Sequence, residues 1–234
     1  MSSTDGILIV DKPSDWTSHD VCAFIRSRFR IKKVGHAGTL DPLATGVLVV
    51  LIGRATKESA VLSASDKEYY GVMQLGVKTD SHDRKGKVIA EAPCEGISLE
   101  AVREKAKQFT GEIFQVPPMV SALKHQGVRL YELARKGVEI PRESRPITVH
   151  RFDIIEKDGP FIKFSASVSK GTYLRTLVND LGDVLGCHAS LYELRRVRSG
   201  HYKIDQSITV DELKKLDSQG FYSKLLPLQP TYAR

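Results

Sequence analysis

Apolar residues follow two patterns along the chain, short continuous runs and helical spacing, and the two patterns are interleaved. Continuous runs at 6–10 and 47–52 predict buried strands, because both are short and end at turn-forming residues. Alternation over 68–77 predicts a half-buried strand. The same reasoning predicts further strands at 147–155, 161–169 and 189–198, and helices at 172–185 and 209–216. Strands and helices mix without regular βαβ alternation, which favours the α+β class.

Two helix starts carry capping signals. Thr17 followed by Asp20 is typical of a capping box, and helically spaced apolar residues come after it. Ser98 is predicted to cap a second helix, with Leu99, Val102, Ala106 and Phe109 on one face and Gly111 closing it.

Residues 112–146 differ from the rest of the chain. They contain four prolines and two glycines around one short helical stretch near 129–136. We expect a long, loop-rich excursion here, of the kind that is usually functional or mobile.

The charge is unevenly distributed over the 234 residues. The chain has 35 Lys and Arg against 28 Asp and Glu, a net charge of +7. Residues 1–119 carry 16 basic and 15 acidic side chains, residues 120–203 carry 15 and 9, and residues 204–234 carry 4 and 4. The surplus therefore lies in the middle block, which suggests an anionic partner such as nucleic acid, although a solvated basic face would give the same count.

Several classes of protein are disfavoured by the sequence. It has no apolar run long enough to span a membrane and no secretory signal pattern, and its three cysteines form no CxxC pair. A reducing cytoplasmic setting fits best. No P-loop, GxGxxG, HExxH or GxSxG motif occurs, and the histidines lack metal-ligand spacing.

Asp41 lies in the most unusual segment, GHAGTLDPLATG at 35–46. On spacing alone, Asp41 before Pro42 is an ordinary helix N-cap pair with Gly46 ending the turn. Alternatively, the glycines let a substrate approach the backbone and Asp41 acts as a nucleophile or base.

Two other segments have similar double interpretations. SKGTYLRT at 169–176 joins a strand to a helix and places Arg175 in the first turn, where a cation opposes the helix dipole. This indicates either a specific anionic partner or a structural salt bridge. Tyr69 and Tyr70 should point to opposite faces of one strand, so that one could stack on a base or both could be core aromatics.

Seven strings, in order, resemble the TruB family of pseudouridine synthases, which isomerise a uridine in the T-loop of tRNA. The strings are GILIVDKP, GHAGTLDPLATGVL, SDKEYYGVMQLG, QVPPMVSALKHQGVRLYELARKG, RPITV, SKGTYLRTLVNDLG and YELRRVRSG, spread over residues 6–200. The HAGTLDPLATG string is the most specific of them.

The resemblance implies a role for particular residues. Asp41 matches the family's catalytic aspartate, Tyr69 a tyrosine that stacks on the target base, and Arg175 an arginine that pairs with the aspartate. The other positions are implied to face the substrate or the RNA: His36 and Tyr173 beside the nucleotide, Leu194 in the pocket wall, and Lys12, Pro13, Lys57, Lys124 and Lys170 toward the RNA.

The resemblance also implies an architecture and a set of partners. We expect a pseudouridine synthase fold, with a central mixed, largely antiparallel sheet flanked by helices and an RNA-gripping insertion at about 117–145. We expect one catalytic domain over 1–234 without a C-terminal PUA domain, so that tRNA binding relies on the basic middle block and is sensitive to salt. We expect no cofactor, no metal, no membrane and no obligatory protein partner, and a cytoplasmic monomer.

Two other functions remain open at this point. The chain could be a tRNA-folding chaperone without turnover, although a chaperone would not need Asp41, Tyr69 and Arg175 together. It could also modify a different RNA, or work within a guide-RNA complex as in archaeal and eukaryotic relatives.

Overall fold

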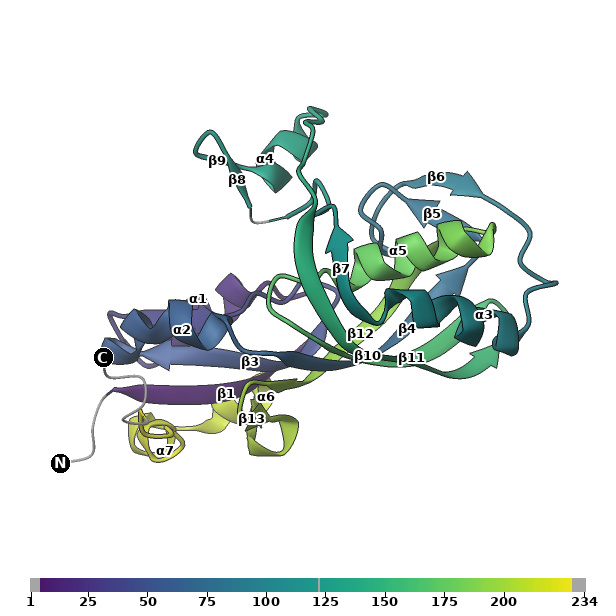
Figure 1. Ribbon diagram of the computed structural model, residues 1–234. Helices are drawn as coiled ribbons and strands as arrows, with labels where there is room; N and C mark the ends of the chain where they lie inside the picture. Colours follow the sequence, from purple (N-terminus) through teal and green to yellow (C-terminus); the bar gives the residue numbers. More distant parts are fainter. Residues whose placement is uncertain (1–4, 122, 229–234) are drawn as a thin grey trace. The chain divides into compact units, whose positions relative to one another are not determined.

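The computed structural model describes residues 5–121 and 123–228, which cluster into two compact units. The first unit comprises the described residues of 1–69 and 194–234, and the second comprises 70–193 (Figure 1). Two strands, β4 (Lys67–Leu75) and β12 (Ala189–Ser199), have residues in both units.

The first unit contains the N-terminal strands and the C-terminal helices. Its elements are β1 (Gly6–Lys12), α1 (Ser18–Arg28), β2 (Val34–Ala37), β3 (Thr45–Ile52), the 3₁₀ helix η1 (Gly53–Glu58), α2 (Ser59–Ser63), β13 (Tyr202–Lys203), η3 (Ile204–Gln206), β14 (Ile208–Thr209), α6 (Val210–Lys215) and α7 (Ser218–Ser223).

The second unit contains the strands and helices between β4 and β12. Its elements are β5 (Val77–Thr79), β6 (Val88–Glu91), α3 (Leu99–Ala106), η2 (Lys107–Phe109), β7 (Gly111–Gln115), β8 (Lys124–His125), β9 (Val128–Arg129), α4 (Leu130–Arg135), β10 (Arg145–Asp158), β11 (Phe161–Val168) and α5 (Leu174–Leu185).

Strand pairing confirms the α+β prediction. Ten strands of the described chain belong to one mixed sheet. In the first unit β3 pairs antiparallel with β1 and β2, and β14 pairs parallel with β1. In the second unit β10 pairs antiparallel with both β11 and β7. Most of the pairings are antiparallel, as expected.

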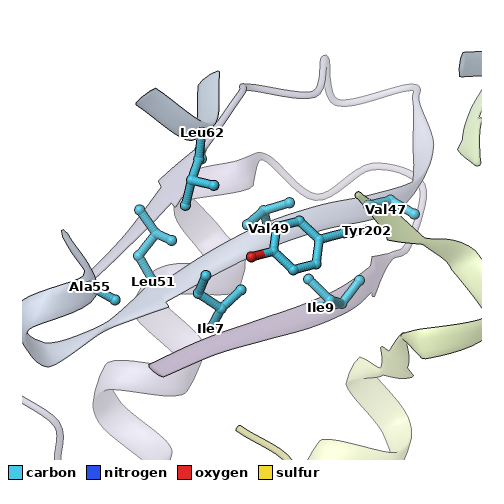
Figure 2. Packing of buried hydrophobic residues seen from close by; sticks show 9 residues of the cluster. Ile7, Ile9, Val47, Val49, Leu51, Ala55, Leu62 and Tyr202 are labelled. Carbon is cyan, nitrogen blue, oxygen red and sulfur yellow. The ribbon is translucent and has the colours of Figure 1, made fainter. Parts of the chain in front are cut away.

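The core of the first unit is built on β1 and β3, whose apolar runs are buried almost throughout. Alternate residues of the two strands, among them Ile7, Val49 and Leu51, meet Leu62 of α2 and Tyr202 of β13 on one face (Figure 2). Both faces of these strands are covered, which explains why their sequences are continuous apolar runs rather than alternating ones.

Several predicted elements are confirmed with small shifts. Thr17 caps α1, where the Asp20 amide donates to the Thr17 hydroxyl at 3.0 Å and the Asp20 carboxylate accepts from the Thr17 amide at 2.8 Å. Ser98 caps α3, and the short helix predicted near 129–136 is α4.

Two predictions are wrong here: that Gly111 closes a helix, and that all of 112–146 is loop-rich, since both ends of that excursion are strands. Gly111 opens β7 rather than closing a helix, because α3 ends at Ala106 and a 3₁₀ turn follows it. Residues 111–115 then pair with residues 145–149 of β10. No local signal marks β7, because its residues are mostly exposed and its partner strand is distant in sequence.

The interpretation of Asp41 as a helix N-cap is also wrong. No helix follows Pro42; residues 41–44 form a turn in which the Ala44 amide donates to the Asp41 carbonyl at 3.0 Å. Gly46 lies inside β3 rather than at the end of the turn.

Candidate active site

Asp41 lies half-buried in the segment between β2 and β3, and this segment is held at almost every backbone carbonyl. The Gly38 and Thr39 carbonyls accept from a buried arginine, and the Leu40 carbonyl accepts from Ser18. The Asp41 carbonyl closes the turn. A loop with its carbonyls satisfied inside the protein is rigid, so the Asp41 side chain leaves a fixed backbone.

The buried arginine is Arg196 of β12, whose side chain is 1% exposed. Its guanidinium donates to the carbonyls of Gly38 at 2.9 Å, Thr39 at 3.4 Å and Val47 at 2.7 Å. Its backbone pairs in parallel register with Gly46. Arg196 therefore contacts the segment on both sides of Asp41.

Ser18, the first residue of α1, is 2% exposed and binds the same segment. Its hydroxyl accepts from the Leu40 amide at 2.8 Å and donates to the Leu40 carbonyl at 3.2 Å. The capping box that starts α1 thus also places a hydroxyl beside the residue that precedes Asp41.

Lys12 is completely buried, which does not fit the RNA-facing role that the resemblance implies for it. Its ammonium donates to the carbonyls of Pro13 at 2.8 Å, Trp16 at 2.6 Å and Pro42 at 3.2 Å. Burial lowers the pKa of Lys12 to about 8, and the nearby Asp41 carboxylate opposes this shift. Lys12 joins the end of β1 to the Asp41 turn rather than presenting a surface charge.

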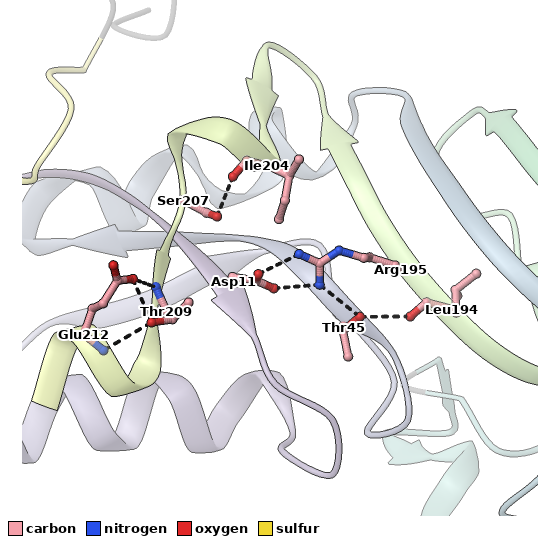
Figure 3. Close-up of polar contacts among 8 residues, drawn as sticks. All are labelled: Asp11, Thr45, Leu194, Arg195, Ile204, Ser207, Thr209 and Glu212. Carbon is pink, nitrogen blue, oxygen red and sulfur yellow. Dashed lines mark hydrogen bonds and ion pairs between the residues drawn. The ribbon is translucent and has the colours of Figure 1, made fainter.

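An ion pair between Asp11 and Arg195 lies beside Thr45, the first residue of β3. Arg195 donates to both carboxylate oxygens of Asp11, at 2.7 and 3.1 Å, and to the Thr45 hydroxyl at 3.3 Å. Thr45 in turn donates to the Leu194 carbonyl at 3.5 Å, so the contacts form one chain across β1, β12 and β3 (Figure 3). This chain ties Leu194, which is 8% exposed, to the segment that carries Asp41.

The other site residues predicted in the first unit lie on separate elements. His36 is on β2, and burial lowers its pKa, as does the charge of Arg196. Within the described residues, the buried His36 Nδ1 has no hydrogen-bond partner.

Tyr69 on β4 is 8% exposed and Tyr70 is 55% exposed, so the two side chains do point to opposite faces. Lys57 is exposed in η1, and Pro13 is half-buried after β1.

Arg175 lies in the second unit, in the first turn of α5, and is 2% exposed. Its guanidinium donates to the carbonyls of Ser81 at 3.2 Å and Val120 at 2.5 Å. It also lies over the ring of Tyr173, 5.6 Å from the centroid. Arg175 and Tyr173 are therefore neighbours in space.

Gln115 holds the backbone of Tyr173 from both sides. Its amide nitrogen donates to the Tyr173 carbonyl at 3.1 Å, and its amide oxygen accepts from the Tyr173 backbone N–H at 2.8 Å. Gln115 is 3% exposed and ends β7, so this strand positions the entry to α5.

Two predicted cations lie on loops or short strands of the second unit. Lys170 is exposed between β11 and α5, as a contact to RNA requires. Lys124 lies in β8, and its side chain is outside the part of the chain that is described.

Sequence reasoning did not single out Arg196, Ser18, Gln115 or the pair Asp11 and Arg195. The doubled arginine in LRRVR was a possible signal, since two adjacent arginines in a strand must face opposite sides. The acceptors are backbone carbonyls, which leave no trace in a sequence.

The described residues contain neither a metal-ligand cluster nor a membrane-spanning helix. No group of three or more His, Cys, Asp or Glu side chains there could hold a metal ion. No helix of that part of the chain is long and apolar enough to cross a membrane.

Comparison with solved structures relates this arrangement to known proteins. A crystal structure of a Cbf5–Nop10–Gar1 complex matches with a TM-score of 0.75 and 30% identity, over 96% of this chain and 60% of that one. An H/ACA RNP bound to a substrate RNA containing 2′-deoxyuridine matches with a TM-score of 0.70 and 28% identity, over 95% of this chain and 59% of that one.

Sequence comparisons are more specific. The model of the TruB family pseudouridylate synthase N-terminal domain matches residues 26–174, and that of the tRNA pseudouridylate synthase B C-terminal domain matches 175–228. The chain is 45% identical to tRNA pseudouridine synthase B of Geobacter sulfurreducens, over 95% of this chain and 73% of the relative. It is 43% identical to the protein of that name in Opitutus terrae, over 96% and 93%.

Fold and sequence together define a pseudouridine synthase, an enzyme of the isomerase class. Within that class, the chain belongs to the TruB family.

Proposed function

We propose that the protein converts uridine to pseudouridine in the T-loop of tRNA, at position 55, with Asp41 as the reacting group. The observation that carries this proposal is the placement of Asp41. It lies at the centre of the segment that matches the family motif, and the backbone carbonyls of this segment accept hydrogen bonds that fix its path. A rigid backbone that presents one carboxylate is what a pre-organised nucleophile or base requires.

The reaction needs little besides positioning. The bond from the sugar C1′ to N1 breaks, the base turns, and C5 bonds to C1′ while its proton leaves to solvent and N1 is protonated. No electron acceptor or external energy source enters this balance. The target uridine is stacked in a folded loop, so it must first be flipped out at a cost of a few kcal/mol.

Other residues share the remaining tasks in this proposal. Tyr69 stacks on the flipped base, an interaction worth about 1–3 kcal/mol, and Leu194 forms an apolar wall. Arg175 pairs with Asp41 and orients its carboxylate, with Tyr173 beside it. His36 contacts the flipped nucleotide; its pKa is lowered by burial, and its buried Nδ1 has no hydrogen-bond partner among the described residues.

The RNA is held by cations outside this set. We assign RNA contacts to three lysines and one proline, Lys57, Lys124, Lys170 and Pro13, and the grip on the T-arm to the excursion at 117–145. Lys12 keeps the structural role that its burial gives it. In this proposal the catalytic domain works in the cytoplasm, as a monomer and without a cofactor.

The test is tritium release from tRNA labelled at uridine C5. Wild type is expected to release tritium from a T-loop substrate, and Asp41→Asn is expected to release none while keeping its affinity for the RNA. No release by wild type would contradict the activity, and equal release by the variant would contradict the role of Asp41.

Arg175→Ala separates two roles for that cation. We expect a large loss of rate with a modest loss of RNA affinity, because the guanidinium is 2% exposed and serves the carboxylate. The opposite pattern would mean that Arg175 holds a phosphate.

A further inference from the structure

Arg196 is the largest of the side chains that are almost fully buried. Burying a guanidinium is costly unless its N–H groups are hydrogen-bonded. Its three described bonds, to Val47, Gly38 and Thr39, all have backbone carbonyls as acceptors. The arginine therefore satisfies the polypeptide backbone, and with 1% exposure it has no surface with which to touch a substrate.

The acceptors lie at both ends of one segment. Gly38 and Thr39 precede Asp41, and Val47 follows it in β3. One planar group thus joins the two ends of the turn-containing segment 38–47. Bringing the ends of a flexible segment together costs entropy, and a rigid fork of donors that holds both ends removes that freedom from the folded state.

The backbone of Arg196 restricts the segment as well. It lies in register with Gly46, and a Cβ on Gly46 would overlap the Arg196 carbonyl oxygen. Gly38 has a φ of +82°, and its α-carbon faces the Arg196 guanidinium. Side chain and backbone of one residue therefore set the path of the chain on both sides of Asp41.

We propose that Arg196 is a positioning residue, which clamps segment 38–47 and so holds the Asp41 carboxylate in its reactive position. The inference rests on the proposed function, in which Asp41 reacts. Misplacing a reacting group by about 1 Å can cost about 100-fold in rate. The clamp acts on the rate of the chemical step rather than on RNA binding, because the guanidinium is buried.

The experiment compares Arg196→Lys and Arg196→Met with Arg103→Met. Lysine keeps the charge but lacks the planar fork that reaches three carbonyls. Arg103 is the control: it is an exposed arginine whose guanidinium also donates to two backbone carbonyls, those of Ile154 and Ile155 at 3.1 and 3.0 Å, outside the Asp41 segment. Two quantities are measured at a temperature where circular dichroism shows each variant folded: kcat and KM for tRNA by tritium release, and amide hydrogen exchange by peptide.

For Arg196→Lys we expect kcat to fall about 100-fold with KM within about threefold of wild type. Exchange should become faster in residues 38–47 and remain unchanged elsewhere, a local effect that a general loss of stability would not produce. Arg103→Met should retain wild-type kcat and loop exchange. If Arg196→Met fails to fold, Arg196→Lys provides the test.

Three results would overturn the inference: kcat of Arg196→Lys within about threefold of wild type, unchanged exchange in 38–47, or an equal loss of kcat in Arg103→Met. These results are distinct from a failure of the proposed function, which would appear as an inactive wild type or a fully active Asp41→Asn. The exchange measurement needs no turnover, so it decides whether Arg196 holds the segment in either case.

Discussion

Gly46 lies directly against the backbone of Arg196, with no room between the two residues for a side-chain carbon. A Cβ at Gly46 would overlap the Arg196 carbonyl oxygen, and the φ of +97° is itself unfavourable for an L-residue. The relationship explains why glycine follows the Asp41 turn, a position for which the sequence alone predicts only the end of that turn. A substitution at Gly46 therefore tests how closely β3 and β12 approach each other at this point.

Gly46→Ala is expected to destabilise the protein by more than backbone strain alone, because the strands must separate. Gly111→Ala is the matched control, since Gly111 has a similar φ of +102° and open space around its α-carbon. We expect about 1–2 kcal/mol for Gly111→Ala and at least about 2 kcal/mol more for Gly46→Ala. Urea denaturation measures both losses, and equal losses would contradict the close contact.

Ser18→Ala is expected to cost about 1–3 kcal/mol, because it leaves the Leu40 amide and carbonyl without their buried partner. Ser14→Ala is the control: its hydroxyl has only long contacts, at 3.4 and 3.5 Å, and should cost little. Both losses are read from urea denaturation. A Ser18→Ala protein as stable as the control variant would contradict the proposed support of the loop.

The pair Asp11 and Arg195 is expected to couple by about 1 kcal/mol in a double-mutant cycle of Asp11→Asn and Arg195→Met. The geometry is bidentate, but the side chains are 21% and 44% exposed, so solvent screens the pair. Unfolding free energies of wild type, both single variants and the double variant provide the coupling. Purely additive losses would show that the pair is not energetically linked.

His82 predicts an acid sensitivity. Burial and the charges of Arg175, Lys78 and Arg142 lower its pKa to about 4, while Asp183 opposes them. The unfolded chain, with a histidine pKa of about 6.5, binds more protons between these values. Stability is therefore fully present above about pH 6.5 and is lost as the pH falls toward 4, by about 3 kcal/mol from this group.

His82→Asn tests this sensitivity, because asparagine tolerates the φ of +64° at this position. The difference in unfolding free energy between pH 6.5 and pH 4.5 should be smaller in the variant than in wild type. His150→Asn, at an exposed position of β10, is the control and should keep the wild-type dependence. If the variant keeps the wild-type dependence of stability on pH, the pKa of His82 is not lowered in the folded protein.

Salt should weaken RNA binding steeply. Lys170→Gln at an exposed cation of the basic block should lower tRNA affinity and reduce the slope of log K against log salt by about 0.7–1. Lys214→Gln, in the segment without net charge, should leave the slope unchanged. Filter binding over a range of salt concentrations provides both slopes, and identical slopes in the two variants would contradict a role of Lys170.

The local elements could be predicted because their causes are local. Thr17 and Asp20 cap α1 through atoms three residues apart, and the apolar runs of β1 and β3 are buried on both faces. By contrast, β7 escaped prediction because its partner β10 begins 30 residues later, and an exposed strand has no apolar pattern of its own.

The sequence by itself determined the fold class and the family and predicted the role of Asp41, because these depend on patterns and motifs that are contiguous in the chain. Only the tertiary structure decided what holds Asp41. Arg196 is 155 residues away along the chain and binds backbone carbonyls, which every residue has and no motif marks. It also decided that Lys12 is buried, since a lysine in a sequence has the same charge whether it meets solvent, RNA or the carbonyls of Trp16 and Pro42.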